Sequence, residues 1–270
     1  MFDQFMASLA QQDAVLVTVQ SHRGSVPREA GTWMAVFADH AVGTVGGGQL
    51  EWQAQQEARA MLHSSAPACQ KRYPLGPALG QCCGGEVHLH YEPVSAQAIP
   101  ALRQRWTRQM ARWPLVALFG GGHVGRALVA LLQTLPVRLH WVDSRDEIFP
   151  SNLPEQVVCE HSQPVQAAVA DLPAGVQVLI MSFSHAEDLD VVAACLERQR
   201  QRSDLAFIGL IGSKTKWAAF SHRLAERGFS ARELAQVTCP IGVPGIVGKA
   251  PEVIAVAVAA QLLQVMPKID

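Results

Sequence analysis

The sequence has little net charge, no long apolar run and no secretory signal in its first ten residues. Its 22 Lys and Arg are balanced by 23 Asp and Glu, so no overall positive field attracts nucleic acid or anionic lipid. The longest apolar run, 253–266, is shorter than the roughly 20 residues that a membrane-spanning helix needs. Residues 1–10 carry Asp3 and lack the basic and apolar regions of a signal peptide. We therefore expect a cytoplasmic protein without nucleic-acid or membrane partners.

Cysteine is sparse, and none of the six residues forms a C-x-x-C pair typical of zinc or redox sites. A disulfide framework is not expected in a reducing compartment. Single buried thiols are usually structural, which is our interpretation of the four isolated cysteines. These are Cys69, Cys159, Cys195 and Cys239.

The other two cysteines, Cys82 and Cys83, are adjacent and lie between glycines. Neighbouring Cα atoms are about 3.8 Å apart, below the usual disulfide range of about 4.4–6.8 Å, which disfavours a bridge between them. Flanking glycines permit close approach, so the pair suits a soft metal or a sulfur atom as ligand. His88 and His90 share one face of a predicted strand and either join this site or form a solvated face.

The first third of the chain favours strands. Short β-branched or alternating runs predict strands at 14–19, 32–37 and 86–91, and a helix at 50–63 follows a glycine turn. A basic, proline-bounded stretch then predicts a helical connector. We therefore expect an N-terminal α+β domain at 1–95, a connector at 96–113 and a second domain at 114–270.

The second domain alternates strands and helices. Apolar runs of strand length alternate with helical patterns, which favours a parallel sheet with helices on both faces. The predicted strands are 115–119, 137–142, 176–183 and 205–211. The predicted helices are 123–135, 187–199, 214–227 and a last one beginning at 251.

A G-x-G-x-x-G motif connects the first of these strands to its helix. Gly120, Gly122 and Gly125 allow close approach of a phosphate, and the helix beginning at His123 offers free N–H groups. Asp143, at the end of the next strand, is placed to accept a ribose hydroxyl. The pattern predicts a doubly wound, Rossmann-like α/β domain that binds a nucleotide-like ligand. Arg145 either favours a phosphorylated ligand or faces water.

Two further segments have alternative interpretations. The turn of Gly46, Gly47 and Gly48 precedes the helix at 50–63 and either binds an anion or is a plain tight turn. His185 follows the strand at 176–183 and is a candidate for proton transfer. Alternatively, Ser184 caps that helix, with Glu187 completing a capping box.

Taken in order, eight blocks of the sequence resemble the XdhC/CoxI family, the accessory proteins of bacterial xanthine dehydrogenase and related molybdenum hydroxylases. The blocks are GSVPR (24–28), GTVGGGQLE (43–51), CCGG (82–85), GGGHVG (120–125), VDSR (142–145), SH (184–185), IGLIGSK (208–214) and CPIG (239–242). Together they extend over nearly the whole chain. At Phe183 the sequence departs from the histidine expected in many relatives.

The resemblance implies a chaperone that binds the molybdenum cofactor, Mo-molybdopterin. A cysteine desulfurase would sulfurate the bound cofactor, and the chain would then insert it into apo xanthine dehydrogenase or a related molybdenum hydroxylase. Cys82 and Cys83, beside Gly84, would approach the metal or carry sulfur. The loop at 120–125 would hold the pterin's phosphate or nucleotide-like end with Asp143, and the turn at Gly242 would close the site with free backbone groups. The resemblance also suggests a homodimer.

Two alternatives use the same glycine motif. An NAD(P)-dependent oxidoreductase would bind its nucleotide at Gly120–Gly125 and Asp143, whereas a nucleotide-sensing module would not need the cysteines. The sequence contains no evident set of dehydrogenase acid and base residues, so we expect an accessory protein without turnover of its own.

Overall fold

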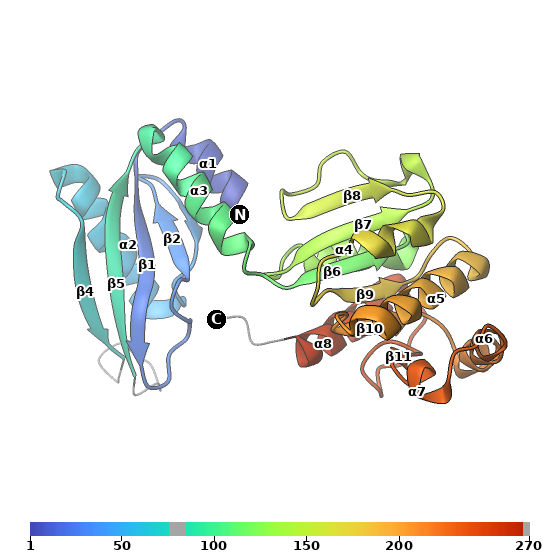
Figure 1. Cartoon of the computed structure of the whole chain (residues 1–270). Helices are drawn as coiled ribbons and strands as arrows, with labels where there is room; N and C mark the ends of the chain where they lie inside the picture. Colours follow the sequence, from blue (N-terminus) through green and yellow to red (C-terminus); the bar gives the residue numbers. More distant parts are fainter. Residues whose placement is uncertain (76–84, 267–270) are drawn as a thin grey trace. The chain divides into compact units, whose positions relative to one another are not determined.

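The computed structural model describes residues 1–75 and 85–266, and the chain divides into two compact units, 1–107 and 108–270 (Figure 1). The first unit is built on an antiparallel sheet and the second on a parallel one. This confirms the predicted fold class of a Rossmann-like domain joined to a smaller α+β domain. Within the described residues, no helix has both the length and the apolar character needed to span a bilayer.

The first unit has a five-stranded sheet in the order β3-β2-β1-β5-β4. Its strands are β1 (Ala14–Arg23), β2 (Trp33–Val36), β3 (Ala41–Gly43), β4 (Cys69–Pro74) and β5 (Glu86–Val94). Its helical elements are α1 (Phe2–Leu9), α2 (Gly48–Ser64), the 3-10 turn η2 (Ala96–Ala98) and α3 (Ile99–Met110).

Both faces of this sheet are covered. Successive apolar side chains of β1 point to opposite faces, and those on each face are buried in a separate cluster. Val15 and Val17 of β1 pack with Leu50 of α2 on one face. Leu16, on the opposite face, packs in a second cluster with residues of α1 and α3. The predicted connector forms α3, whose Leu102 lies in that second cluster.

The second unit has a six-stranded sheet in the order β11-β10-β9-β6-β7-β8. Its strands are β6 (Leu115–Phe119), β7 (Arg138–Asp143), β8 (Val157–His161), β9 (Gln177–Ile180), β10 (Phe207–Leu210) and β11 (Val237–Thr238). Its helical elements are α4 (His123–Leu132), η3 (Asp146–Ile148), η4 (Val165–Asp171), α5 (His185–Arg202), α6 (Lys214–Glu226), α7 (Ala231–Leu234) and α8 (Pro251–Val265).

The chain of this unit begins at the centre of its sheet. From β6 it builds outward through β7 and β8, then crosses to the other side of β6 to add β9, β10 and β11. Helices α4 and α8 pack on one face, and α5, α6 and η4 pack on the other. The order reverses between β6 and β9, and ligands of such sheets bind at the carboxyl ends of the strands at this switch point.

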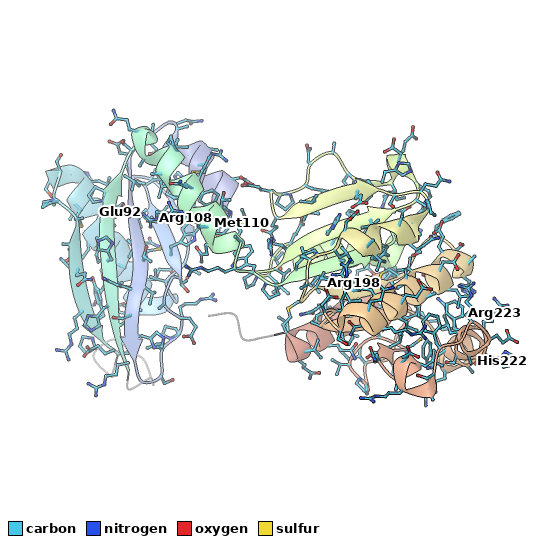
Figure 2. The ribbon with its side chains drawn as sticks, viewed as in Figure 1. Glu92, Arg108, Met110, Arg198, His222 and Arg223 are labelled. Carbon is cyan, nitrogen blue, oxygen red and sulfur yellow. The ribbon has the colours of Figure 1, made fainter. Side chains whose placement is uncertain are left out.

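Charged side chains also have structural roles in this unit. Arg198, near the end of α5 (Figure 2), is buried and pairs with Asp204 at 2.8 Å. It also donates to the Val169 carbonyl at 2.7 Å. Arg198 thereby holds α5 against η4, because a buried guanidinium needs such partners.

The elements that the sequence did not predict are short or lie at the edges of the sheets. The strands and α-helices among them are β3, β4, β8, β11, α1 and α7, and the 3-10 elements η3 and η4 were not predicted either. Strands β4 and β8 are edge strands with largely polar or exposed residues, which hides the alternation that marks a half-buried strand. The predicted strand at 176–183 is shorter than expected, since β9 ends at Ile180.

Candidate functional site

The glycine loop lies at the carboxyl end of β6, at the switch point of the parallel sheet. Gly120 follows Phe119 and donates its N–H to the Val142 carbonyl at 2.8 Å, which holds the loop beside β7. Gly122 is the N-cap of α4, and no side chain caps the helix there. In contrast, Ser184, Ser213 and Ser230 cap α5, α6 and α7.

Three glycines in this loop have distinct structural roles. Gly120 has a φ of +123°, and an added Cβ would lie 1.9 Å from the Met181 carbonyl oxygen. A Cβ at Gly125 would lie 2.1 Å from the Gly120 carbonyl oxygen, so this glycine lets α4 pack against the loop. A Cβ at Gly122 would meet no atom within 4 Å. The first and third glycines therefore serve packing, and the second leaves the open space that a phosphate requires.

Asp143 is buried, with 1% of its surface exposed, and both of its oxygens accept hydrogen bonds. Oδ1 accepts from the Arg145 backbone N–H at 2.9 Å and from Arg145 Nε at 2.8 Å. Oδ2 accepts from the Gly121 N–H at 2.6 Å and from Arg145 Nη2 at 2.9 Å. The carboxylate predicted to accept a ribose hydroxyl is thus already bonded within the chain.

These bonds keep Asp143 ionised. Burial raises the pKa of its carboxyl, but the hydrogen bonds from Arg145 and Gly121 outweigh burial, so the pKa is lowered. The same ion pair raises the pKa of Arg145. Asp143 is therefore a charged anchor that holds Arg145 beside the glycine loop.

Arg145 also contacts the loop that follows β9. Its guanidinium carbon lies 4.4 Å from the ring centre of Phe183. Next to this contact, Ser144 donates to Glu187 Oε1 at 2.7 Å, and Phe183 N–H donates to Glu187 Oε2 at 3.1 Å. These contacts join the loops after β7 and β9, the two strands that flank β6.

The start of α5 agrees with the capping interpretation in part. Ser184 accepts from Glu187 N–H at 3.2 Å and caps the helix. The Glu187 side chain bonds Phe183 and Ser144 rather than closing a reciprocal box with Ser184. His185 is exposed, and its ring packs edge-on against Phe220 of α6, with ring centres 6.3 Å apart.

Two cationic residues near this end of the sheet were not predicted from the sequence. Arg126, in the first turn of α4, donates to the Gly121 carbonyl at 3.3 Å and the Ile148 carbonyl at 2.9 Å, which braces the glycine loop. Lys216 in α6 pairs with buried Asp188 at 2.6 Å. Each residue lies just beyond a sequence motif, Arg126 after 120–125 and Lys216 after 208–214. Their position next to these motifs was the one sequence feature that could have predicted them.

The second glycine loop differs from the first. Glu51 Oε2 accepts hydrogen bonds from the Val45 and Gly47 N–H groups, both at 3.1 Å, and from the Thr44 hydroxyl. Gly46 N–H donates to the Thr44 hydroxyl at 3.1 Å. The chain's own carboxylate takes the place of an anion, so of the two interpretations the structure favours the tight turn over an anion site at Gly46–Gly48.

The turn at Gly242 is also bonded within the chain, contrary to the expectation of free backbone groups. The N–H groups of Ile241, Gly242 and Val243 donate to the Leu210 carbonyl, Gln261 Oε1 and the Ala257 carbonyl, at 3.2, 2.6 and 3.1 Å. These bonds fasten the turn to β10 and α8. Its backbone donors therefore stabilise the fold instead of facing a ligand.

Cys82, Cys83 and Gly84 lie outside the described residues, so their predicted roles stay predictions. On either side of them, Leu75 N–H donates to the Gly85 carbonyl at 2.8 Å. A Cβ at Gly85 would lie 2.2 Å from the Ser25 carbonyl oxygen, which places Gly85 against the GSVPR block.

His88 bonds Glu86 Oε1 at 2.7 Å, so one of the two strand histidines has a carboxylate partner. Residues 1–75 and 85–266 contain no group of three or more His, Cys, Asp or Glu placed to hold a metal ion. Cys195 is fully buried, and burial raises the pKa of its thiol to about 12. This suits a structural thiol.

Among the known proteins similar to this chain, one sequence relative and one solved structure cover nearly all of it. The chain is 25% identical over 272 residues to the uncharacterized protein YqeB of Escherichia coli strain K12, covering 96% of this chain and 45% of YqeB. It therefore spans less than half the length of that relative. A crystal structure described as a xanthine dehydrogenase from Bacillus halodurans has a TM-score of 0.73 at 19% identity, covering 97% of this chain and 94% of that one. At that identity the likeness shows a shared fold.

Family models match both units. The model of the XdhC Rossmann domain matches residues 116–262, more than half of the chain, and therefore includes the glycine loop, Asp143 and Phe183. The model of the XdhC and CoxI family matches residues 7–74, which include the Glu51 loop. Seven of the eight sequence blocks lie within these matches, and the CCGG block at 82–85 lies between them. The resemblance to the family is thereby confirmed, and the chain belongs to the XdhC and CoxI family.

Proposed function

We propose that this chain is an accessory protein for a xanthine dehydrogenase or a related molybdenum hydroxylase. Its cargo is the molybdenum cofactor. The chain holds the cofactor while a cysteine desulfurase supplies the sulfide ligand, and it then delivers the cofactor to the apo-hydroxylase. The observation that carries the proposal is the glycine loop at the start of α4 in a chain of this family, where the N-cap Gly122 has open space beside it and no side chain caps the helix.

The phosphate of the cargo would lie at the glycine loop. The first turn of α4 presents backbone N–H groups and the positive end of the helix dipole, and both favour an anion. Arg126 holds the loop in place through Gly121 and Ile148. The adjacent Arg145 adds a guanidinium with 35% of its side chain exposed. Cys82 and Cys83 remain our candidates for contact with metal or sulfur.

The hydrogen bonds of Asp143 favour this proposal over an NAD-dependent oxidoreductase. NAD needs an acidic side chain at this position to accept its ribose hydroxyls, whereas a nearby arginine accommodates the 2′-phosphate of NADP. Here Arg145 and Gly121 already donate to both oxygens of Asp143, which disfavours NAD. His185, the candidate for proton transfer, packs against Phe220 of α6.

The test is the cofactor content of protein purified without oxygen from cells that make the cofactor. Wild-type protein should contain nearly stoichiometric molybdenum and oxidised pterin. Gly122→Val should lose both, because its side chain fills the open space while the φ of −69° at this residue remains allowed. Thr134→Val, just past the other end of α4, is the matched control and should retain the cofactor.

The cysteine role is tested in parallel with the Cys82→Ala, Cys83→Ala double variant, which should also lose the cofactor. Absence of molybdenum and pterin from the wild type, together with failed reloading by isolated cofactor, would refute the proposed function. Full retention by Gly122→Val would refute the role of the glycine loop, and full retention by the double variant would refute that of the cysteines. Dispensable cysteines would agree with a nucleotide-sensing module.

A further inference from the structure

We propose that Arg145 and Phe183 determine the ligand specificity of the crevice at the glycine loop. They close its adenosine side, the part in which a dinucleotide would place its adenosine. The crevice then accepts a phosphate-bearing ligand that brings no ribose diol to Asp143. The inference rests on the proposed function only in treating this crevice as the ligand site.

The position of the contact supports this role. Arg145 follows β7 and Phe183 follows β9, and these strands lie on either side of β6, whose end carries the glycine loop. The guanidinium stacks over the ring at 4.4 Å, so the contact crosses the carboxyl end of β6. Dinucleotides bind in the crevice at this end of a Rossmann sheet, and here the chain's own side chains extend across it.

The hydrogen-bond acceptors of Asp143 are also full. Each carboxylate oxygen has about two lone-pair sites, and each oxygen of Asp143 accepts two hydrogen bonds within the chain. Two of these four bonds come from the Arg145 side chain, one to each oxygen. Ribose hydroxyls would therefore have to displace Arg145 from its ion pair with the buried Asp143 carboxylate.

A second carboxylate beside this contact, that of Glu187, ties the two loops together. Glu187 Oε1 accepts from the Ser144 hydroxyl, and Glu187 Oε2 accepts from the Phe183 N–H. These two bonds hold the loops after β7 and β9 together and keep Phe183 next to Arg145. Glu187 therefore supports the closed arrangement.

Donors for an anion remain beside the closed side. A guanidinium has five N–H groups, and two of those of Arg145 bond the Asp143 carboxylate. The other N–H groups do not bond this carboxylate, and 35% of the Arg145 side chain is exposed. Arg145 is held at the glycine loop because Gly121 N–H and Arg145 Nη2 donate to the same oxygen of Asp143. The same residue thus removes the acceptors that a diol needs and adds donors that a phosphate can use.

Arg145→Ala tests the inference because it frees one acceptor site on each oxygen of Asp143. Isothermal titration calorimetry would measure dissociation constants for ADP-ribose and for inorganic pyrophosphate. The ratio of the two constants separates the adenosine contribution from the lost positive charge. We expect Arg145→Ala to bind ADP-ribose at least tenfold more tightly, relative to pyrophosphate, than the wild type does.

Phe183→Ala is the second variant, because it leaves the ion pair with Asp143 intact and removes an exposed ring, so it should fold even if Arg145→Ala does not. A relative gain of about threefold is expected.

Arg200→Ala is the matched control, since Arg200 also stacks on a ring, Phe229 at 4.9 Å, and pairs with a carboxylate, Glu233. Arg200 is in the last turn of α5, whereas the crevice adjoins its first turn. This variant should leave the ratio unchanged.

A ratio unchanged in both Arg145→Ala and Phe183→Ala, or micromolar ADP-ribose binding by the wild type, would overturn the inference. If either result were obtained and the wild type retained molybdenum and pterin, the proposed function would stand without this inference. No binding of either probe to any variant would overturn the inference and count against the glycine loop as an anion site. If wild-type protein contained no cofactor but Arg145→Ala showed the expected gain in relative ADP-ribose affinity, the molybdenum cofactor would be refuted as the cargo. The closing role of Arg145 would remain.

Discussion

Two glycine loops in this chain precede helices and have open space beside one glycine, Gly47 in one loop and Gly122 in the other, but they differ in what the nearest carboxylate does. At Gly46–Gly48, Glu51 accepts the loop's N–H groups and places a negative charge where an anion would bind. At Gly120–Gly125, the acidic residue Asp143 is neutralised by Arg145, and Gly122 has open space beside it. Glycine content is therefore a poor guide to anion binding, because the nearest carboxylate and its partner decide whether the donors are free.

The largest change in stability is expected when the first glycine of the Rossmann loop is replaced. Gly120→Ala puts a Cβ 1.9 Å from the Met181 carbonyl and forces an L residue to a φ of +123°. Overpacking and backbone strain should together cost about 3 kcal/mol, a loss of roughly 6–12 °C in the melting temperature. Gly122→Ala is the control and should melt within about 2 °C of the wild type. Equal losses in both variants, measured by thermal unfolding, would contradict the assigned roles.

Asp143→Asn should have the next largest effect. The variant removes the charge that binds Arg145 and should lower the free energy of unfolding by about 2 kcal/mol at pH 7, as expected for hydrogen bonds to charged groups. Because the folded-state pKa of Asp143 is lowered, its stabilisation is present above the unfolded pKa of about 3.9 and is lost as pH falls through the folded-state value. Urea unfolding at pH 7 and pH 3 checks this sign. A difference between the variant and the wild type that does not shrink at pH 3 would argue against it.

Glu51→Ala should convert the loop at Gly46–Gly48 toward the behaviour of the loop at Gly120–Gly125. Removing the carboxylate leaves N–H groups of Val45 and Gly47 without their acceptor, at a cost of about 1.5 kcal/mol. Added phosphate should restore part of this loss by taking the place of the carboxylate, and should have no such effect on the wild type. Glu57→Ala is the control. Glu57 lies in the same helix as Glu51, and its replacement removes a surface ion pair with Lys71 of β4. Thermal unfolding across a phosphate series measures both effects.

The smallest expected effect concerns the helix caps. Ser184→Ala removes the N-cap of α5 and should cost about 1 kcal/mol. Gly122→Ser supplies a side-chain cap to α4, and the gain should be only a few tenths of a kcal/mol, since glycine is itself a fair N-cap. Urea unfolding resolves the first change. A loss from Gly122→Ser as large as that from Ser184→Ala would show that the space beside Gly122 is not open.

The parallel sheet was predictable because its signals are local. Apolar runs such as 115–119, glycine turns and helix starts all lie within a few neighbouring residues. Elements at the edges of the sheets, β4 and β8 among them, were missed because only one of their sides is paired and much of their surface faces solvent. The Glu51 contact was within reach of the sequence, since Glu51 lies only four residues beyond Gly47. A carboxylate one turn into a helix should be checked before a glycine loop is interpreted as an anion site.

By itself the sequence determined the family, the fold class and the position of the Rossmann glycine loop, because each depends on motifs in a fixed order. Only the tertiary structure decided how that loop is used. Asp143 meets Gly121 across 22 residues of sequence, and Arg145 reaches Phe183 through the neighbouring order of β7, β6 and β9. Hydrogen-bond donors and acceptors are satisfied by whatever lies near them in space, and that proximity is set by how the strands pair.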